Sequence, residues 1–146
     1  MILRRADLAE AGEVARLHRQ VMRLSLHYLP ELHTAQEDLW FFRERLLPEN
    51  ETWVAEIGGA IVGYIAFKSG WISHLYIRPD HQGRGLGDRL LAKAMEDGTP
   101  RELWTFQRNT RARAFYETRG FVLVRLTDGE DNEEKEPDAL YAWPGR

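Results

Sequence analysis

The chain has no cysteine in its 146 residues. A disulfide framework, a thiolate nucleophile and a cysteine-based zinc site are therefore excluded. Its five histidines, at positions 18, 27, 33, 74 and 81, do not have the spacing of a metal site, so we expect no bound metal.

Long apolar runs are missing as well. The longest stretch without a charged residue, 58–67, is far shorter than the ~20 residues that a membrane-spanning helix needs. Asp7, Glu10 and Glu13 lie where a signal peptide would have its apolar core. These absences predict a cytoplasmic protein with no membrane partner.

Linkers, low-complexity segments and internal repeats are absent too. Because 43% of the residues are hydrophobic, a chain of this length can bury one substantial core. We therefore expect a single domain over residues 1–146.

Apolar periodicity predicts both helices and strands along the chain. Helices are expected at about 7–24, 35–47 and 110–119, with a further helix ending near 97. The second helix begins with Thr34-Ala-Gln-Glu37, a capping box, and ends at Pro48. Strands are expected at 1–5, 52–57, 60–68, 71–77, 102–107, 121–127 and 139–143. The aromatic residues 40–42 are interpreted as core and staple residues.

A glycine-rich turn separates the strand end at 75–77 from an amphipathic helical segment. Gly83, Gly85 and Gly87 would each weaken a helix start by roughly 1 kcal/mol relative to alanine, so they need another role. A strand, a tight turn and a helix N-terminus leave backbone N–H groups unpaired, with the helix dipole behind them. Such an arrangement predicts a pyrophosphate site.

The spacing of these glycines fits neither the dinucleotide-binding fingerprint nor the P-loop. The segment Gln82-Gly-Arg-Gly-Leu-Gly87 instead resembles the acyl-CoA-binding motif Q/R-x-x-G-x-G/A of the GNAT superfamily of N-acetyltransferases. A second block, from Asn109 to Phe121, lies where that superfamily has one. The resemblance covers about residues 1–127.

The resemblance implies an α/β fold with a central mixed, mostly antiparallel sheet, helices on both faces, and splayed strands at 71–77 and 102–107. It also implies acetyl-CoA as co-substrate, with the pantetheine arm between these two strands, and no metal. The cofactor contacts that it implies come from the strand (Leu75, Tyr76, Ile77), the turn (Gln82, Gly83, Arg84, Gly85, Leu86, Gly87, Asp88) and the second block (Asn109, Phe115, Tyr116).

The same resemblance implies that Tyr116 acts as general acid toward the departing sulfur. Helical spacing places Asn109, Ala112 and Tyr116 on one face, so Asn109 and Tyr116 can reach one groove. Both have structural alternatives, because Asn109 is a good helix N-cap and Tyr116 could be a core aromatic beside Phe115.

A general base is needed because a primary amine with a pKa near ~10.4 is mostly protonated at neutral pH. Many members of the superfamily have a glutamate on one of the splayed strands, but the corresponding positions here hold Trp71 and Trp104. His74 is the candidate base; a merely packed or solvated histidine and a chain of waters are the alternatives. His33 could line the amine pocket.

The segment 127–138 is long for a connection between two strands, and six acidic residues lie between 130 and 138 against one lysine. Glu133 and Glu134 would attract a cationic amine, whereas a solvated, mobile loop is the alternative. Residues 78–119 hold nine basic and six acidic residues, against eleven and seventeen elsewhere. The basic part of the chain would suit a pyrophosphate and the acidic part a cationic substrate. The alternative is that both are ordinary solvated faces.

We therefore expect an acetyl-CoA-dependent N-acetyltransferase that acts on a small-molecule or peptide amine by direct attack in a ternary complex, since no residue lies in a nucleophile motif. The alternative is a CoA-binding regulatory module without catalysis. Nucleic acid is not an expected partner, given the glycine spacing and the net charge of −3. A monomer or a homodimer is expected.

Overall fold

Seven strands form one sheet in the computed structural model, which describes residues 1–146. In sheet order they are β1 (Ile2–Arg5), β2 (Glu51–Ile57), β3 (Ala60–Lys68), β4 (Gly70–Ile77), β5 (Arg101–Phe106), β7 (Asp138–Trp143) and β6 (Val122–Thr127). Only β4 and β5 are parallel, and every other neighbouring pair is antiparallel. The mixed, mostly antiparallel sheet is thus confirmed, with strand ends within one residue of those expected.

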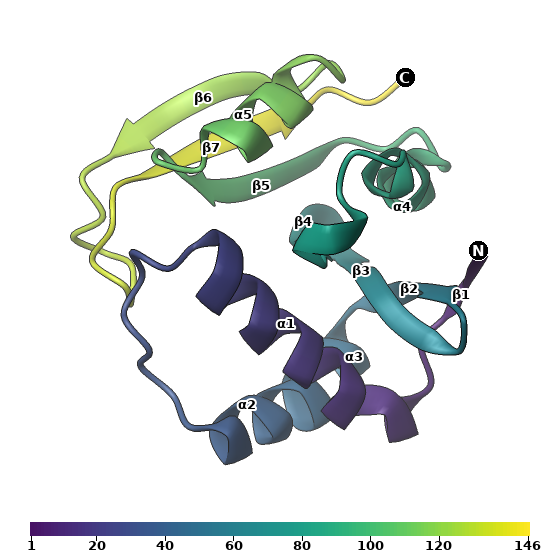
Figure 1. The fold of residues 1–146 in the computed structure, drawn as a ribbon. Coiled ribbons are helices and arrows are strands. Elements are labelled where there is room, and N and C mark those ends of the chain that lie inside the picture. The colour runs from purple at the N-terminus through teal and green to yellow at the C-terminus, as the bar shows by residue number, and fades with distance from the viewer.

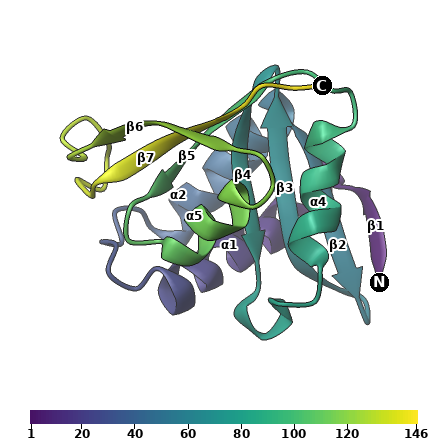
Figure 2. The same ribbon diagram turned by 90° about the horizontal axis from the view of Figure 1, so that it is seen from above.

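Helices cover both faces of this sheet (Figure 1 and Figure 2). One face carries η1 (Leu8–Glu10), α1 (Ala11–Ser25), α2 (Ala35–Phe41), the π-helical turn η2 (Phe42–Leu46) and α3 (Leu47–Glu49); the other carries α4 (Leu86–Met95) and α5 (Thr110–Glu117), with the short η3 (Pro79–His81) before α4. Each face has its own buried cluster, one built around α1 and one around α4 and α5. The expected covering of both faces is confirmed.

The first two helical segments begin at side-chain caps. The carboxylate of Asp7 accepts a hydrogen bond from the Ala9 amide at 2.9 Å, so the expected helix at 7–24 starts as a 3₁₀ turn. Thr34 and Glu37 form the predicted capping box, with exchanged bonds of 2.8 and 3.1 Å.

The expectation that residues 40–42 are all core or staple residues is wrong for two of them. Phe42 is buried, but Trp40 is 53% and Phe41 is 42% exposed. Leu39, Phe42 and Leu46 lie three and four residues apart and face the α1 cluster, so the helical turn directs Trp40 and Phe41 away from it. The helix also ends at Glu49 rather than before Pro48.

Candidate cofactor and acceptor site

The sheet divides between its two parallel strands. β4 pairs with β5 only at Gly70–Arg101 and Trp71–Glu102, and the strands then separate, as Figure 2 shows. A bulge lies just beyond the last pair, because Ala66 is opposite His74 whereas Phe67 is opposite Ile72. Such a bulge bends a strand, so it directs β4 away from β5. The expected splay of these strands is confirmed.

The open edge of β4 presents main-chain groups to this division. The Arg78 amide donates to the Val62 carbonyl of β3 at 2.8 Å. Because the hydrogen-bonding groups of a strand alternate between its two sides, the main-chain groups of Leu75 and Ile77 lie on the side away from β3. Leu75 and Ile77 are two of the three strand residues for which the resemblance implies cofactor contacts.

The glycine-rich turn follows directly. Gly83 and Gly85 have φ of 78° and 79°, a left-handed conformation that costs other residues roughly 1–2 kcal/mol. An added Cβ at either position would meet open space, so the turn is uncovered on the outside. Gln82 fixes the turn to β4, since its amide nitrogen donates to the Ile77 carbonyl at 3.1 Å.

Gly87 has a different role from its neighbours. A Cβ at this position would lie 3.0 Å from the Phe115 ring. The missing side chain thus lets α4 approach α5, and the expected contact with pyrophosphate is not needed to explain this glycine.

A groove of about 610 Å³ runs along the turn between α4, α5 and β4, and we call it the cofactor groove. It is lined by most of the predicted cofactor residues, namely Leu75, Tyr76, Ile77, Gln82, Gly83, Gly85, Leu86, Gly87, Asp88, Asn109, Phe115 and Tyr116. Arg84 is exposed and does not line it. Sequence reasoning missed His81, Arg111 and Arg119 and the end of α1, where Val21, Ser25 and Leu26 complete the lining.

The charge of Asp88 in the first turn of α4 is neutralised locally. The Arg119 guanidinium forms a bidentate ion pair with Asp88, with 2.9 Å between Nη2 and Oδ2, and lowers the pKa of that carboxyl. Arg119 also lies over the Phe115 ring at 3.8 Å. The positive end of the α4 dipole is therefore not opposed by an unpaired carboxylate.

Tyr116 lies where the cofactor groove meets the division of the sheet. Its ring is buried, and it lines both the groove and a smaller cavity of about 60 Å³ between β4 and β5, which we call the gap. Burial raises the pKa of Tyr116 far above its usual value, so the phenol is protonated and uncharged at neutral pH. Asn109 also lines both spaces, and its side-chain oxygen caps α5 at 3.2 Å from the Ala112 amide.

No carboxylate lines the gap, whose titratable groups are His74, Tyr76 and Tyr116. Nδ1 of His74 lies 2.8 Å from the Tyr64 hydroxyl, and that hydroxyl lies 2.9 Å from Nδ1 of His18 on α1. Burial lowers the pKa of His18 to about 4 and that of His74 well below its usual range. Both imidazoles are therefore neutral at neutral pH. Sequence reasoning missed His18 and Tyr64.

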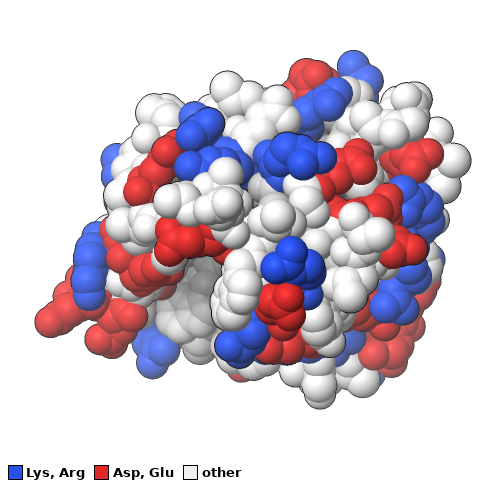
Figure 3. All heavy atoms as spheres, turned by 90° about the horizontal axis from the view of Figure 1, so that it is seen from below, with Lys and Arg blue, Asp and Glu red and all other residues white.

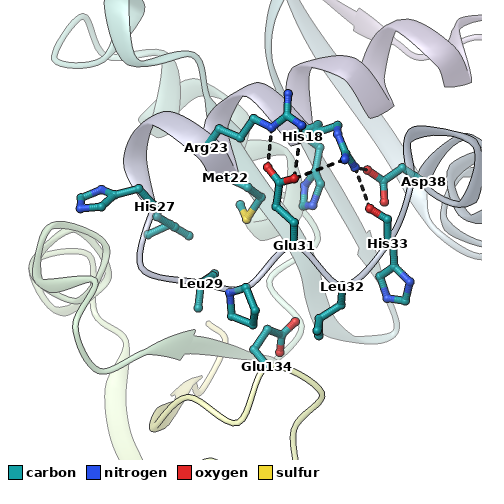
Figure 4. Close-up of a pocket in the computed structure, with 13 residues that line it drawn as sticks. His18, Met22, Arg23, His27, Leu29, Glu31, Leu32, His33, Asp38 and Glu134 are labelled. Carbon is teal, nitrogen blue, oxygen red and sulfur yellow. Dashed lines mark hydrogen bonds and ion pairs between the residues drawn. The ribbon is translucent and has the colours of Figure 1, made fainter.

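A second pocket lies on the other side of α1, under the segment 26–34 (Figure 4), and we call it the acceptor pocket. It has a volume of about 250 Å³. Its cations and acids are largely paired, since Arg23 binds Glu31 and Arg19 binds Asp38 at 2.8 Å. In Figure 4 Glu134 lies below the segment 26–34, and the His27 side chain points away from the pocket.

The acidic segment is held in place by specific contacts, one of which reaches His33 of this pocket. Nε2 of His33 lies 2.5 Å from Glu133, and Arg108 forms a bidentate pair with Glu136 at 2.7 and 2.9 Å. Glu134 lines the acceptor pocket, and its charge adds to burial in raising the pKa of Tyr76 to about 12. The structure therefore brings the three predicted substrate residues together, and Figure 3 shows a hollow beside acidic groups on this side of the molecule.

No helix has the length and apolar character that crossing a membrane would require.

Residues 18–121 match the acetyltransferase (GNAT) family. An uncharacterized N-acetyltransferase of Archaeoglobus fulgidus is 31% identical over 134 residues, which cover 80% of this chain and 89% of that protein. Among solved structures, apo YjaB of Escherichia coli has a TM-score of 0.78 at 23% identity, with both chains fully covered. YncA of Salmonella typhimurium, solved with its cofactor acetyl-CoA, has a TM-score of 0.75 at 17% identity and covers 99% of this chain and 93% of its own. This chain belongs to the GNAT family of acetyltransferases.

Proposed function

We propose that this protein transfers an acetyl group from acetyl-CoA to a primary amine by direct attack in a ternary complex. The observation that carries the proposal is the division of the sheet beside the glycine-rich turn, with β4 and β5 paired only at residues 70–71 and 101–102. A pyrophosphate on the turn amides would place an extended pantetheine arm along the open edge of β4. The thioester would then lie in the gap.

The reaction needs a proton donor and a proton acceptor in that gap. The amine nitrogen forms a bond to the thioester carbon, the carbon–sulfur bond breaks, and the departing thiolate takes a proton from the Tyr116 hydroxyl. His74 is the base for the amine proton. Tyr116 and His74 both line the gap, which supports these roles.

A cationic acceptor fits the acceptor pocket, whose lining shares Leu26 with that of the gap. Glu134 and His33 line the acceptor pocket, and Glu133 contacts His33. A carboxylate at this place would raise the local concentration of an ammonium and would orient it before deprotonation. We propose a small-molecule amine, or the amine of a peptide, as the acceptor. A single catalytic domain over 1–146, a cytoplasmic location, and a monomer or homodimer remain predictions.

A CoA-binding regulatory module is the second candidate, and the absence of a carboxylate from the gap favours it. A panel of cationic, neutral and anionic amines, assayed for thiol release from acetyl-CoA and for the acetylated product, separates the two. We expect amine-dependent release with at least one cationic amine. Tight binding of acetyl-CoA without thiol release for any amine would favour the regulatory module instead.

A further inference from the structure

A continuous chain of hydrogen bonds crosses the α1 side of the sheet. It runs from His74 on β4 through the hydroxyl of Tyr64 on β3 to His18 on α1, with distances of 2.8 and 2.9 Å. Tyr64 is fully buried, whereas the two imidazoles border different cavities: His74 lines the gap and His18 lines the acceptor pocket. The chain thus links two separate cavities through the core.

Hydrogen counting leaves this chain two possible directions. The Tyr64 hydroxyl has one hydrogen, so it can donate to only one Nδ1 and must accept from the other. One imidazole then carries its hydrogen on Nδ1 and the other on Nε2. If His74 is the Nδ1–H tautomer, its Nε2 has a free lone pair, and His18 carries a hydrogen on Nε2.

The surroundings keep the chain dry and neutral. The His18 and His74 rings stack at 5.0 Å, Phe42 packs against both, and Tyr76 lies edge-on to both. Two acidic charges act on this cluster: Asp38 on α2 acts on His18 but is paired with Arg19, and Glu134 acts on Tyr76. Three polar groups at this depth cost more to bury than three apolar side chains would, even when they are hydrogen-bonded, so packing does not explain their choice.

We propose that His74, Tyr64 and His18 form a proton relay that carries the amine proton from the gap to the acceptor pocket; this inference rests on the proposed acetyl transfer. The amine proton binds Nε2 of His74, and the Nδ1 proton of His74 moves to the Tyr64 oxygen. The hydroxyl proton of Tyr64 moves to Nδ1 of His18, and the Nε2 proton of His18 passes to water. The relay ends with no net charge, and the freed amine lone pair attacks the thioester.

The tautomers test the relay without any measurement of activity. Nitrogen-15 NMR of the wild-type protein near pH 7 should show His74 as the Nδ1–H tautomer and His18 as the Nε2–H tautomer. Tyr64→Phe keeps the ring but removes the hydroxyl that couples the two imidazoles. The tautomer of His74 should then no longer determine the tautomer of His18. An Nε2–H tautomer for His74 in the wild type would overturn the proposal, because that nitrogen could not accept the amine proton.

Kinetics supply the second arm. Tyr64→Phe should lower kcat by roughly 10²-fold, the lower end of the range for proton-transfer groups, with unchanged affinity for acetyl-CoA. Tyr141→Phe is the matched control, because it removes another buried hydroxyl, one that bonds Arg113 and Glu117 outside both cavities. Wild-type kcat in a folded Tyr64→Phe would overturn the relay and leave acetyl transfer intact, whereas thiol release by neither protein would contradict the proposed function itself.

Chemical rescue tests whether protons leave the relay through His18. His18→Ala opens space on the acceptor pocket, so free imidazole should restore activity in proportion to its concentration, after subtraction of its reaction without enzyme. Gln20→Ala, at an exposed position of α1 that lines neither cavity, should neither lose activity nor respond to imidazole. A His18→Ala protein that binds acetyl-CoA normally and keeps wild-type kcat would show that protons do not leave through His18.

Discussion

At the scale of single residues, Tyr116 shows how position decides chemistry. The side chain is buried among apolar neighbours of the α4–α5 cluster, yet it borders both the cofactor groove and the gap. A core aromatic would need no hydroxyl, whereas a proton donor needs one that stays protonated. The raised pKa of Tyr116 meets that second need.

Replacing Tyr116 by phenylalanine tests this role. The ring and its packing are preserved, so the fold and the affinity for acetyl-CoA should survive. The kcat should fall by roughly 10²–10⁴-fold, the range for general acid–base groups. The loss should be greatest above neutrality, where other proton sources are scarce, so kcat should be measured across pH with the amine saturating. Wild-type kcat at every pH would leave Tyr116 as a packing residue.

His18 gives a prediction about stability rather than catalysis. Its pKa is about 4 in the folded protein, against a reference of 6.5, so the unfolded chain binds its proton first as the pH falls. The stability from neutral His18 is fully present above pH 6.5 and is lost between pH 6.5 and 4, by up to about 1.4 kcal/mol per pH unit. Glu10, with a pKa of about 2, loses its contribution only at lower pH.

Urea unfolding of wild type and His18→Asn between pH 7 and 5 measures the contribution of His18 to the pH dependence of the free energy of unfolding. The asparagine amide can still reach the Tyr64 hydroxyl but does not titrate, so the variant should lose less stability over this range. Parallel curves for the two proteins would contradict the assignment of a buried, neutral His18.

At the scale of elements, the turn before α4 combines two glycine functions that the sequence pattern does not separate. Gly83 and Gly85 supply a left-handed backbone, whereas Gly87 removes a side chain between two helices. The pattern therefore predicted the motif correctly and interpreted one of its three glycines too simply.

Gly85→Ala should weaken the binding of acetyl-CoA by roughly tenfold or more. Alanine at a φ of 79° costs about 1–2 kcal/mol, and relaxation of the turn would misdirect the amides. Gly59→Ala pays a similar cost at a φ of 80° in the β2–β3 hairpin, away from the groove, and is the matched control. Calorimetric titration with acetyl-CoA gives the affinity of each folded variant. Equal affinities of Gly85→Ala and Gly59→Ala for acetyl-CoA would show that the turn does not bind the pyrophosphate.

The connection from β6 to β7 offers another element to test. Glu134→Gln should raise the KM for a cationic amine with little change in kcat, because a charge at the entrance acts mainly on capture. Glu130→Gln, an exposed position in the same connection that lines neither the acceptor pocket nor the gap, is the control. The effect should be largest at low ionic strength, where screening is weakest. An unchanged KM there would leave the segment with no role in substrate capture.

At the scale of the whole molecule, local patterns predicted the elements, and the resemblance to the GNAT superfamily predicted how they assemble into one sheet. The apolar run at 60–68, the capping box at Thr34 and the glycine turn each report a short stretch of chain, and the structure has each element where expected. No local pattern predicted the π-helical turn at 42–46. The exposure of Trp40 follows from the helical spacing of Leu39 and Phe42, which the sequence already contained.

The site was predictable only as far as its residues are neighbours in sequence. Asn109 and Tyr116 share one helix, so helical spacing was sufficient to place them in one groove. His18, Tyr64 and His74 come from three elements, and the sheet order brings them together. Tyr64 lies within an apolar strand run and reads as an ordinary core residue, so its hydroxyl could not be identified before the fold was known.

The central claim is that acetyl-CoA and the amine meet in one divided sheet and react directly. Initial rates measured while both substrates are varied should give intersecting double-reciprocal lines. Mass spectrometry after incubation with acetyl-CoA alone should show the unmodified chain, since it has no cysteine and no serine in a nucleophile motif. Parallel lines together with an acetylated protein that passes its acetyl group to the amine would contradict direct transfer.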